Sequence, residues 1–109
     1  MKIKRKRILV IAAHPDDEIL GCGGSVAKWI RQGHNVSSLI MSEGSTSRDN
    51  KRNRKKRHKE ISDLQIAAKK SAKILGVKLI KFFNFPDNRM DSVNLIDVVK
   101  LIEKQIKLL

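Results

Sequence analysis

The residues best suited to chemistry lie together in the segment His14-Pro15-Asp16-Asp17-Glu18. His14 and Asp17 are three positions apart, and the proline between them stiffens the backbone. An imidazole nitrogen and a carboxylate oxygen can therefore converge on one divalent ion. Catalytic zinc usually has three protein ligands and an open position for water, so the segment predicts part of the ligand set of such a site.

Asp16 stands next to an expected ligand, and its side chain is expected to point elsewhere. A carboxylate in this place is free to take a proton from water, as a general base does. A simpler interpretation stays open: His14 is a hydrogen-bonded core histidine, and the acids form a cluster that the positive end of a helix dipole favours. In that case the segment has a structural role only.

Three apolar segments are expected to form the strands that position these residues. The run at 8–12 is uninterrupted and rich in β-branched residues, which is typical of a parallel strand buried on both faces. The segments at 36–41 and 77–83, whose apolar residues are interrupted by Ser and by Lys, predict the second and third strands.

Helical patterns follow the strands. The glycine-rich segment 21–24 is expected to be a turn that leads into a helix at 25–31, which Gly33 ends. A second helix is expected at 61–75, with Gly76 as its stop signal. A third helix follows, capped by Asp91 or Ser92, and its buried stripe is expected to consist of Leu95, Ile96, Val99, Ile102 and Ile106.

This alternation predicts an α/β fold, a Rossmann-like parallel sheet with flanking helices and right-handed crossovers. The chain is expected to be a single incomplete domain, residues 1–109, truncated after the third β-α unit. Ligands of such sheets bind beyond the carboxyl ends of the strands. The loops at 14–24, from 42 into the basic run, and at 84–91 are therefore expected to form the site.

Composition excludes several classes of protein. With 40% hydrophobic and 32% charged residues, the chain is expected to be globular, neither disordered nor membrane-spanning. The single cysteine, Cys22, excludes an internal disulfide and a cysteine-rich zinc module. The basic start and the apolar run after it imitate a secretion signal, but His14 and the acids interrupt it, so a cytoplasmic protein is expected.

Much of the net charge of +13 lies in two stretches, a basic amino-terminal tail at 1–7 and a basic run at 48–59. Both are expected to be solvated and to lie outside the core. Clustered Lys and Arg neutralise phosphates, so a nucleic-acid contact is one alternative function of the run. No aromatic residue interleaves the run, which disfavours stacking on bases and a nucleic-acid partner.

The glycines at 21–24 suggest a second alternative, a dinucleotide-binding loop. Glu43 follows Gly23 by about twenty residues, at the end of an expected strand, where a ribose-binding acid would stand. The carboxylates at 16–18 directly precede the glycines and would repel a pyrophosphate, which counts against this alternative.

Two adjoining motifs link the chain to a known family. Ala13-His14-Pro15-Asp16-Asp17-Glu18, followed by Leu20-Gly21-Cys22-Gly23-Gly24, matches the signature of the LmbE-like/PIG-L deacetylases, so the chain resembles that family. Further similarity lies at 42–44, 75–77 and 85–91, and the resemblance covers nearly everything from Ile8 onward.

The resemblance implies a zinc-dependent hydrolase that removes the N-acetyl group from an N-acetylglucosaminyl-type amino sugar, a small-molecule partner, and leaves a free amine and acetate. It implies that His14 and Asp17 bind Zn²⁺ and that Asp16 is the general base. Asp87, Arg89 and, more weakly, Arg48 would contact sugar hydroxyls.

In this family a later histidine supplies the third zinc ligand and another polar group steadies the oxyanion, and neither is expected within these 109 residues. His34 is expected at the opposite edge of the sheet and His58 in the basic run, so neither is counted as a ligand. Each missing oxyanion donor removes roughly 3 to 4 kcal/mol of stabilisation. The chain alone is therefore expected to bind metal weakly and to be nearly inactive.

Overall fold

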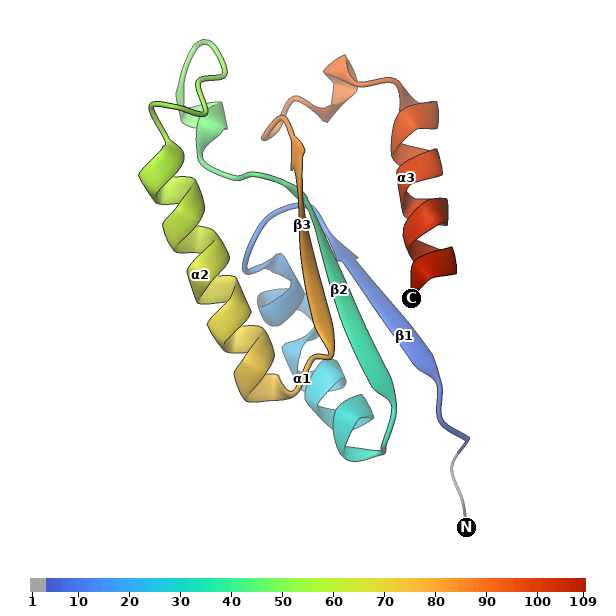
Figure 1. Ribbon diagram of the computed structural model, residues 1–109. Helices are drawn as coiled ribbons and strands as arrows, with labels where there is room; N and C mark the ends of the chain where they lie inside the picture. Colours follow the sequence, from blue (N-terminus) through green and yellow to red (C-terminus); the bar gives the residue numbers. More distant parts are fainter. Residues whose placement is uncertain (1–3) are drawn as a thin grey trace.

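The fold is built on a parallel sheet of three strands in the order β1-β2-β3 (Figure 1). The structure is a computed structural model that describes residues 4–109, apart from the side chain of Arg48. The strands are β1 (Arg7–Ala12), β2 (Asn35–Ser42) and β3 (Leu79–Phe85). Each strand begins and ends within two residues of the range that its apolar pattern predicts, and the α/β prediction is confirmed.

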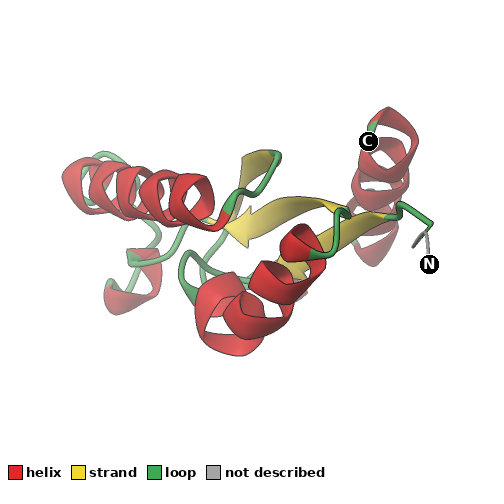
Figure 2. Ribbon diagram, turned by 90° about the horizontal axis from the view of Figure 1, so that it is seen from below, coloured by secondary structure: helices red, strands yellow, loops and turns green. Residues whose placement is uncertain are grey.

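Helices flank the sheet on both sides. The helices α1 (Asp17–Arg31) and α2 (His58–Leu75) connect consecutive parallel strands and pack on the same face, as right-handed crossovers in one direction require. The helix α3 (Leu95–Leu108) crosses back and lies near β1 on the other side (Figures 1 and 2). Short 3₁₀ turns at Thr46–Arg48 and Met90–Ser92 follow β2 and β3.

The core centres on β2, the middle strand, whose residues 36–42 are all buried. Leu39 and Ile40 have no exposed surface, and the helices contribute Val26, Ile61 and other small apolar residues. The register shifts between Ile40 and Ser42, where β2 meets the end of β3. An irregularity of this kind re-aims the chain where it leaves the sheet, which is the edge that carries the site.

The predicted turn at 21–24 is wrong. The helix α1 already begins at Asp17, so the glycines lie inside it. Asp17 in the first turn favours this early start, since an exposed acid stabilises the positive end of a helix, and the packing of Val26 outweighs the low helix propensity of glycine. These glycines therefore form no loop that could cradle a pyrophosphate.

The buried stripe predicted for α3 is also wrong for most of its members. Leu95 is 77% exposed, Ile96 56%, Val99 38% and Ile106 57%. The helix is tied to the sheet by polar contacts instead, because Lys81 Nζ donates to Gln105 Oε1 at 2.6 Å and an Arg7 guanidinium donates to the Leu109 carbonyl at 2.9 Å. Its amino-terminal cap is Asn94, while Asp91 and Ser92 belong to the preceding 3₁₀ turn.

The basic tail is shorter than predicted. Arg7 is the first residue of β1, and the Lys6 amide donates to His34 Nδ1 at 3.1 Å. Residues 1–3 lie outside the described part of the chain. Among residues 4–109, no helix combines the length and the apolar character that crossing a membrane requires.

Candidate active site

The loops after the three strands meet at the carboxyl edge of the sheet, as the parallel topology predicts. The Ser42 amide donates to the Ala13 carbonyl at 2.8 Å, which ties the loop after β2 to the loop after β1. The Glu43 amide donates to the Phe85 carbonyl at 3.3 Å and ties it to the loop after β3. Residues from each loop are thereby held within reach of His14.

His14 and Asp17 face one another. His14 Nδ1 lies 3.3 Å from Asp17 Oδ2, and the same oxygen accepts the backbone N–H of His14 at 3.1 Å. Two ligands held about 2.0–2.1 Å from a tetrahedral zinc ion lie about 3.3–3.4 Å from each other. The spacing of this nitrogen and this oxygen therefore fits a shared zinc ion, and both side chains are open to solvent, 31% and 49% exposed.

Asp87 contacts the other side of the His14 ring. Its Oδ1 lies 2.6 Å from His14 Nε2, and its Oδ2 accepts the Ser47 backbone N–H at 3.2 Å. Burial alone would raise the pKa of Asp87, but the hydrogen bonds from Ser47 and the proximity of His14 outweigh it and lower the pKa. The expected contact with sugar hydroxyls stays a prediction, and both carboxylate oxygens already have protein partners.

Asp16 is exposed at the amino terminus of α1. Its φ is 86°, in the left-handed region, and its side chain makes no capping hydrogen bond. Its backbone carbonyl accepts the amides of Ile19 and Leu20 at 3.0 and 2.9 Å. The backbone of Asp16 thus starts the helix, while its exposed carboxylate does not cap it.

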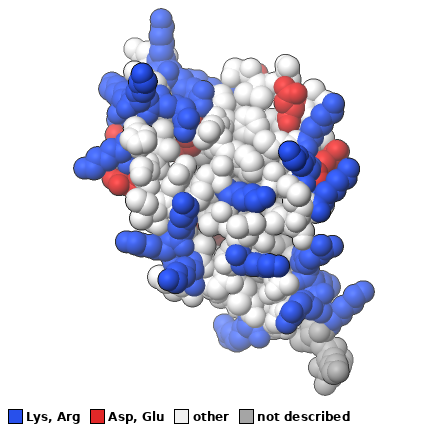
Figure 3. All heavy atoms as spheres, in the orientation of Figure 1, with Lys and Arg blue, Asp and Glu red and all other residues white. Residues whose placement is uncertain are grey.

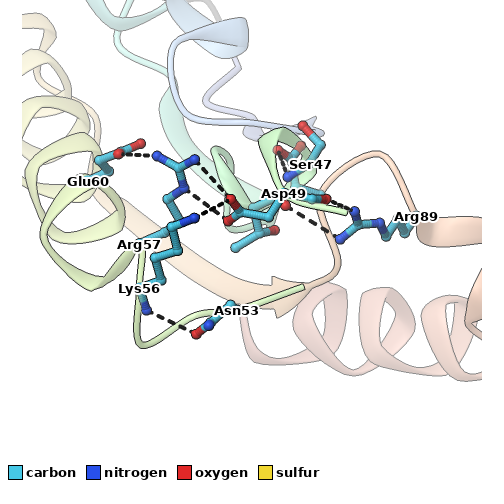
Figure 4. A network of polar contacts seen from close by, with 9 residues as sticks. Ser47, Asp49, Asn53, Lys56, Arg57, Glu60 and Arg89 are labelled. Carbon is cyan, nitrogen blue, oxygen red and sulfur yellow. Dashed lines mark hydrogen bonds and ion pairs between the residues drawn. The ribbon is translucent and has the colours of Figure 1, made fainter. Parts of the chain in front are cut away.

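The family resemblance implies that Arg89 and, more weakly, Arg48 contact sugar hydroxyls, which stays a prediction. Arg89 donates to the backbone carbonyls of Thr46 and Asp49, so it fastens the segment after β2 to the segment after β3 (Figure 4). The side chain of Arg48 lies outside the described part of the chain, although its backbone belongs to the 3₁₀ turn Thr46–Arg48.

Glu43 is a central residue of this edge that the sequence did not single out for such a role. Its side chain is fully buried and accepts hydrogen bonds from Thr46 Oγ1 at 2.8 Å and from Arg52 at 2.7 Å, and Arg54 Nε lies 2.9 Å away. Burial alone would raise the pKa of Glu43, but these partners outweigh it and lower the pKa. A carboxylate paired in this way is not available to a ribose. Neither Glu43 nor the helical segment 21–24 therefore fits the dinucleotide-binding alternative.

The basic run is solvated as predicted, since residues 49–59 are exposed or half-buried, and several of its cations also pair with buried or half-buried acids. Arg57 donates two hydrogen bonds to Asp49 at 3.0 Å and one to Glu60 at 2.6 Å, and Lys56 lies 3.2 Å from Asp49 (Figure 4). The hydrogen bond from Arg57 lowers the pKa of Asp49 to about 2. Blue side chains still crowd the surface in this region (Figure 3). Glu43 comes directly after the buried strand β2 and is followed by several arginines, and this sequence pattern could have indicated its ion pairs with Arg52 and Arg54.

Two cavities adjoin His14. One is lined by residues of β1, β2 and the loop after β3, including Met41, Ser42 and Met90. The other is lined by Pro15, Ser45 and Asp87 among others. Ser42 adjoins the first cavity and Ser45 the second, and within the described chain the Oγ atoms of both are buried and make no hydrogen bond.

The described residues contain no cluster of three or more His, Cys, Asp or Glu side chains arranged to hold a metal ion. His34 accepts the Lys6 amide next to the start of β2, at the far edge of the sheet, and His58 is the first residue of α2. Among the predicted ligands the structure brings His14 and Asp17 together, and Asp16 lies between them in the sequence.

Comparison with known proteins identifies the family. The profile of the GlcNAc-PI de-N-acetylase family, PIG-L, matches residues 9–109. The chain belongs to this family. The resemblance read from the motifs is thereby confirmed.

Individual relatives agree with this family. The chain is 36% identical over 104 residues to an uncharacterized deacetylase of Escherichia coli, a match that covers 95% of this chain and 50% of that protein. The solved N,N'-diacetylchitobiose deacetylase of Pyrococcus horikoshii is 30% identical with a TM-score of 0.66, covering 78% of this chain and 31% of that one. A hydratase, the 4-carboxy-2-hydroxymuconate hydratase of Pseudomonas putida, is 26% identical with a TM-score of 0.60, covering 78% and 36%. The chain spans about half the length of the curated relative and less of the solved ones.

Glu18, the last residue of the PIG-L family motif in this chain, is only 5% exposed, and neither carboxylate oxygen makes a hydrogen bond within the described residues. Burial, together with the charges of Asp16 and Asp17, raises the pKa of Glu18 above its usual 4.5. A raised pKa in the folded state means that the ionised form opposes folding. This destabilisation is absent below the unfolded-state pKa and develops as the pH rises through the folded-state value.

Replacing Glu18 with glutamine should therefore stabilise the metal-free chain near pH 7 and change little near pH 4, because glutamine is uncharged at both. Urea unfolding in the presence of a chelator at both pH values measures the difference, and the exposed Glu103→Gln is the matched control. A stability difference that is the same at both pH values would show that ionisation of Glu18 is not its cause.

Gly44 lies between Pro15, in the loop after β1, and Leu64 of α2. Its φ is 70°, and a Cβ added there would lie 3.3 Å from Leu64 Cδ1 and 3.6 Å from Pro15 Cδ. Gly44→Ala should destabilise the fold by about 1–2 kcal/mol, because alanine is strained in the left-handed region. Gly21→Ala is the control, since Gly21 lies inside α1 with open space around it and should gain about 0.5–1 kcal/mol. Urea unfolding that moves both variants in the same direction would contradict this reasoning.

Proposed function

We propose that this chain carries part of the active site of a zinc-dependent hydrolase that removes the N-acetyl group from an N-acetylglucosaminyl-type amino sugar. The observation that carries the proposal is the 3.3 Å approach of His14 Nδ1 and Asp17 Oδ2, with the uncapped, exposed Asp16 between them in sequence. Membership of a deacetylase family and likeness to a solved diacetylchitobiose deacetylase support the choice of substrate.

His14 and Asp17 would hold the ion. Bound zinc would polarise the acetyl carbonyl and make water a better nucleophile. Asp16 would take a proton from the attacking water, whose oxygen bonds to the acetyl carbon. The carbon–nitrogen bond then breaks, and Asp16 would return the proton to the leaving nitrogen, which gives acetate and a free amine.

The two zinc ligands in the described residues would bind the ion weakly, because catalytic zinc usually has three protein ligands. We propose that the third ligand and the oxyanion donor come from a segment equivalent to the remaining half of the E. coli relative. On its own the chain would be nearly inactive, since removal of a single oxyanion donor lowers the rate by about 10²–10³.

Zinc titration of the chain tests the ligand pair. We expect wild-type protein to bind one zinc ion weakly and His14→Ala and Asp17→Ala to abolish saturable binding, while His34→Ala, at the far edge of the sheet, binds as wild type. Competition with a chromophoric chelator measures the affinity. Equal zinc binding by all four proteins would contradict the assignment of the ligands.

A fusion of this chain to the unmatched part of the E. coli relative tests the reaction. We expect zinc-dependent release of amine from diacetylchitobiose, detected with an amine-reactive fluorophore, at a rate at least about a hundredfold above that of the chain alone. Similarity to the P. putida hydratase makes addition of water to a carbon–carbon double bond the second candidate. A zinc-loaded fusion that hydrates a dienoic acid and releases no amine would replace the first proposal with the second.

A further inference from the structure

The two ring nitrogens of His14 face different carboxylates. Nε2 lies 2.6 Å from Asp87, whose side chain is 5% exposed, while Nδ1 lies 3.3 Å from Asp17, whose side chain is 49% exposed. A neutral imidazole has one proton to donate, and the shorter contact with the more buried carboxylate holds it more strongly. The proton therefore belongs on Nε2, which leaves the lone pair of Nδ1 directed towards Asp17.

We propose that Asp87 is a positioning residue that fixes the tautomer and the orientation of the His14 ring, and so presents Nδ1 and Asp17 Oδ2 to the same ion. The inference rests on the proposed function for the identity of that ion. A metal-binding histidine commonly donates its second ring N–H to a carboxylate, which orients the ring and raises its basicity as a ligand.

Asp87 can do this because the protein holds its second oxygen. Oδ2 accepts the backbone N–H of Ser47 at 3.2 Å, and a backbone amide can only donate. Ser47 lies in a segment fastened from two sides: Thr46 Oγ1 donates to buried Glu43 at 2.8 Å, and Arg89 donates to the Thr46 carbonyl at 3.4 Å. The loops after β2 and β3 thus set the orientation of the Asp87 carboxylate. This arrangement lets Asp17 and Asp87, which are far apart in the sequence, contact the two ring nitrogens of the same histidine.

The substitution Asp87→Asn separates positioning from packing, because asparagine keeps the shape of aspartate but has only one acceptor oxygen. The Ser47 amide requires that oxygen, so the NH₂ group of the asparagine is placed against His14 Nε2. Since an NH₂ group donates, Nε2 must then become the acceptor and the imidazole proton must move to Nδ1. The nitrogen that faces Asp17 would thereby lose its lone pair to a proton.

Long-range ¹H–¹⁵N spectra of metal-free protein with labelled histidine, recorded at a pH where the imidazoles are neutral, report the tautomer directly. We expect His14 to be Nε2-protonated in the wild type and Nδ1-protonated in Asp87→Asn, with His34→Gln and His58→Gln used for assignment. Zinc affinity should fall about 10- to 100-fold in Asp87→Asn. The control Asp63→Asn makes the same charge change at an exposed position of α2 and should alter neither property.

A wild-type His14 that is Nδ1-protonated would overturn the inference, and this readout does not depend on how well any variant folds. An unchanged tautomer in folded Asp87→Asn would overturn it as well, even if thermal unfolding showed a loss of stability. Failure of the proposed function is distinguishable, because a chain that binds no zinc can still show the Nε2 tautomer and its reversal in metal-free protein.

Discussion

Replacing Asp16 with asparagine is expected to lower amine release by the zinc-loaded fusion about 10²- to 10⁴-fold, the range that a positioned general base contributes. Asparagine cannot accept a proton from water at neutral pH. The Asp16 carboxylate makes no capping hydrogen bond and contributes no ligand to the pair formed by His14 and Asp17, so zinc affinity should remain within a few-fold of wild type. The initial rate with diacetylchitobiose, measured at saturating zinc, checks the prediction.

Asparagine is the appropriate replacement because the φ of Asp16 is 86°. Asn adopts the left-handed region far more readily than most residues, whereas alanine there would add strain at the start of α1. Asp16→Ala is therefore a control for strain: it should lose the same catalytic factor and also some stability. If Asp16→Asn retained most of the rate, the base would have to be another group, and exposed Asp17 would be the first to examine.

The sequence predicted the features that local patterns encode. The uninterrupted apolar run at 8–12 located β1, and the three- to four-residue periodicity up to Gly76, whose φ is 90°, located the end of α2. Because the strands are parallel, the rule that ligands bind at their carboxyl ends also predicted which loops converge. That rule is why residues as distant in sequence as His14 and Asp87 could be placed at one edge before their contact was known.

Other features depend on pairings that a local pattern does not contain. Glycines at 21–24 suggest a turn by propensity, but the acids before them and the core residue Val26 after them keep the segment helical. The apolar residues of α3 have the period of a buried stripe, yet period alone does not say what covers them, and most of them are exposed. Likewise a run of cations predicts a solvated surface, which the run at 48–59 largely has, but it does not show that some of these cations pair with a buried acid such as Glu43.

Removing the Glu43 carboxylate is expected to be among the most destabilising single changes at this edge. In Glu43→Ala, Thr46 Oγ1 loses its acceptor inside the protein, and the guanidinium groups of Arg52 and Arg54 remain side by side without their counter-charge. Hydrogen bonds to charged groups and broken buried ion pairs suggest a loss of about 2–4 kcal/mol. This is less than for a wholly buried pair, since the arginine side chains are 36% and 44% exposed and can reach water.

The lowered pKa of Glu43 determines how the stability difference between wild type and Glu43→Ala changes with pH. Because the pKa of Glu43 is lower in the folded protein than its usual 4.5, its stabilisation is present above that value and is lost as the pH falls through the folded-state pKa. Urea unfolding should therefore separate wild type from Glu43→Ala most widely near neutral pH and less in acid. Glu43→Gln keeps one acceptor and should lose less, while Arg54→Ala removes a partly exposed partner and should lose under about 1 kcal/mol. If the loss of unfolding free energy in Glu43→Ala persisted unchanged in acid, the packing of the Glu43 side chain, rather than its ion pairs, would hold the loop beside Asp87 in place.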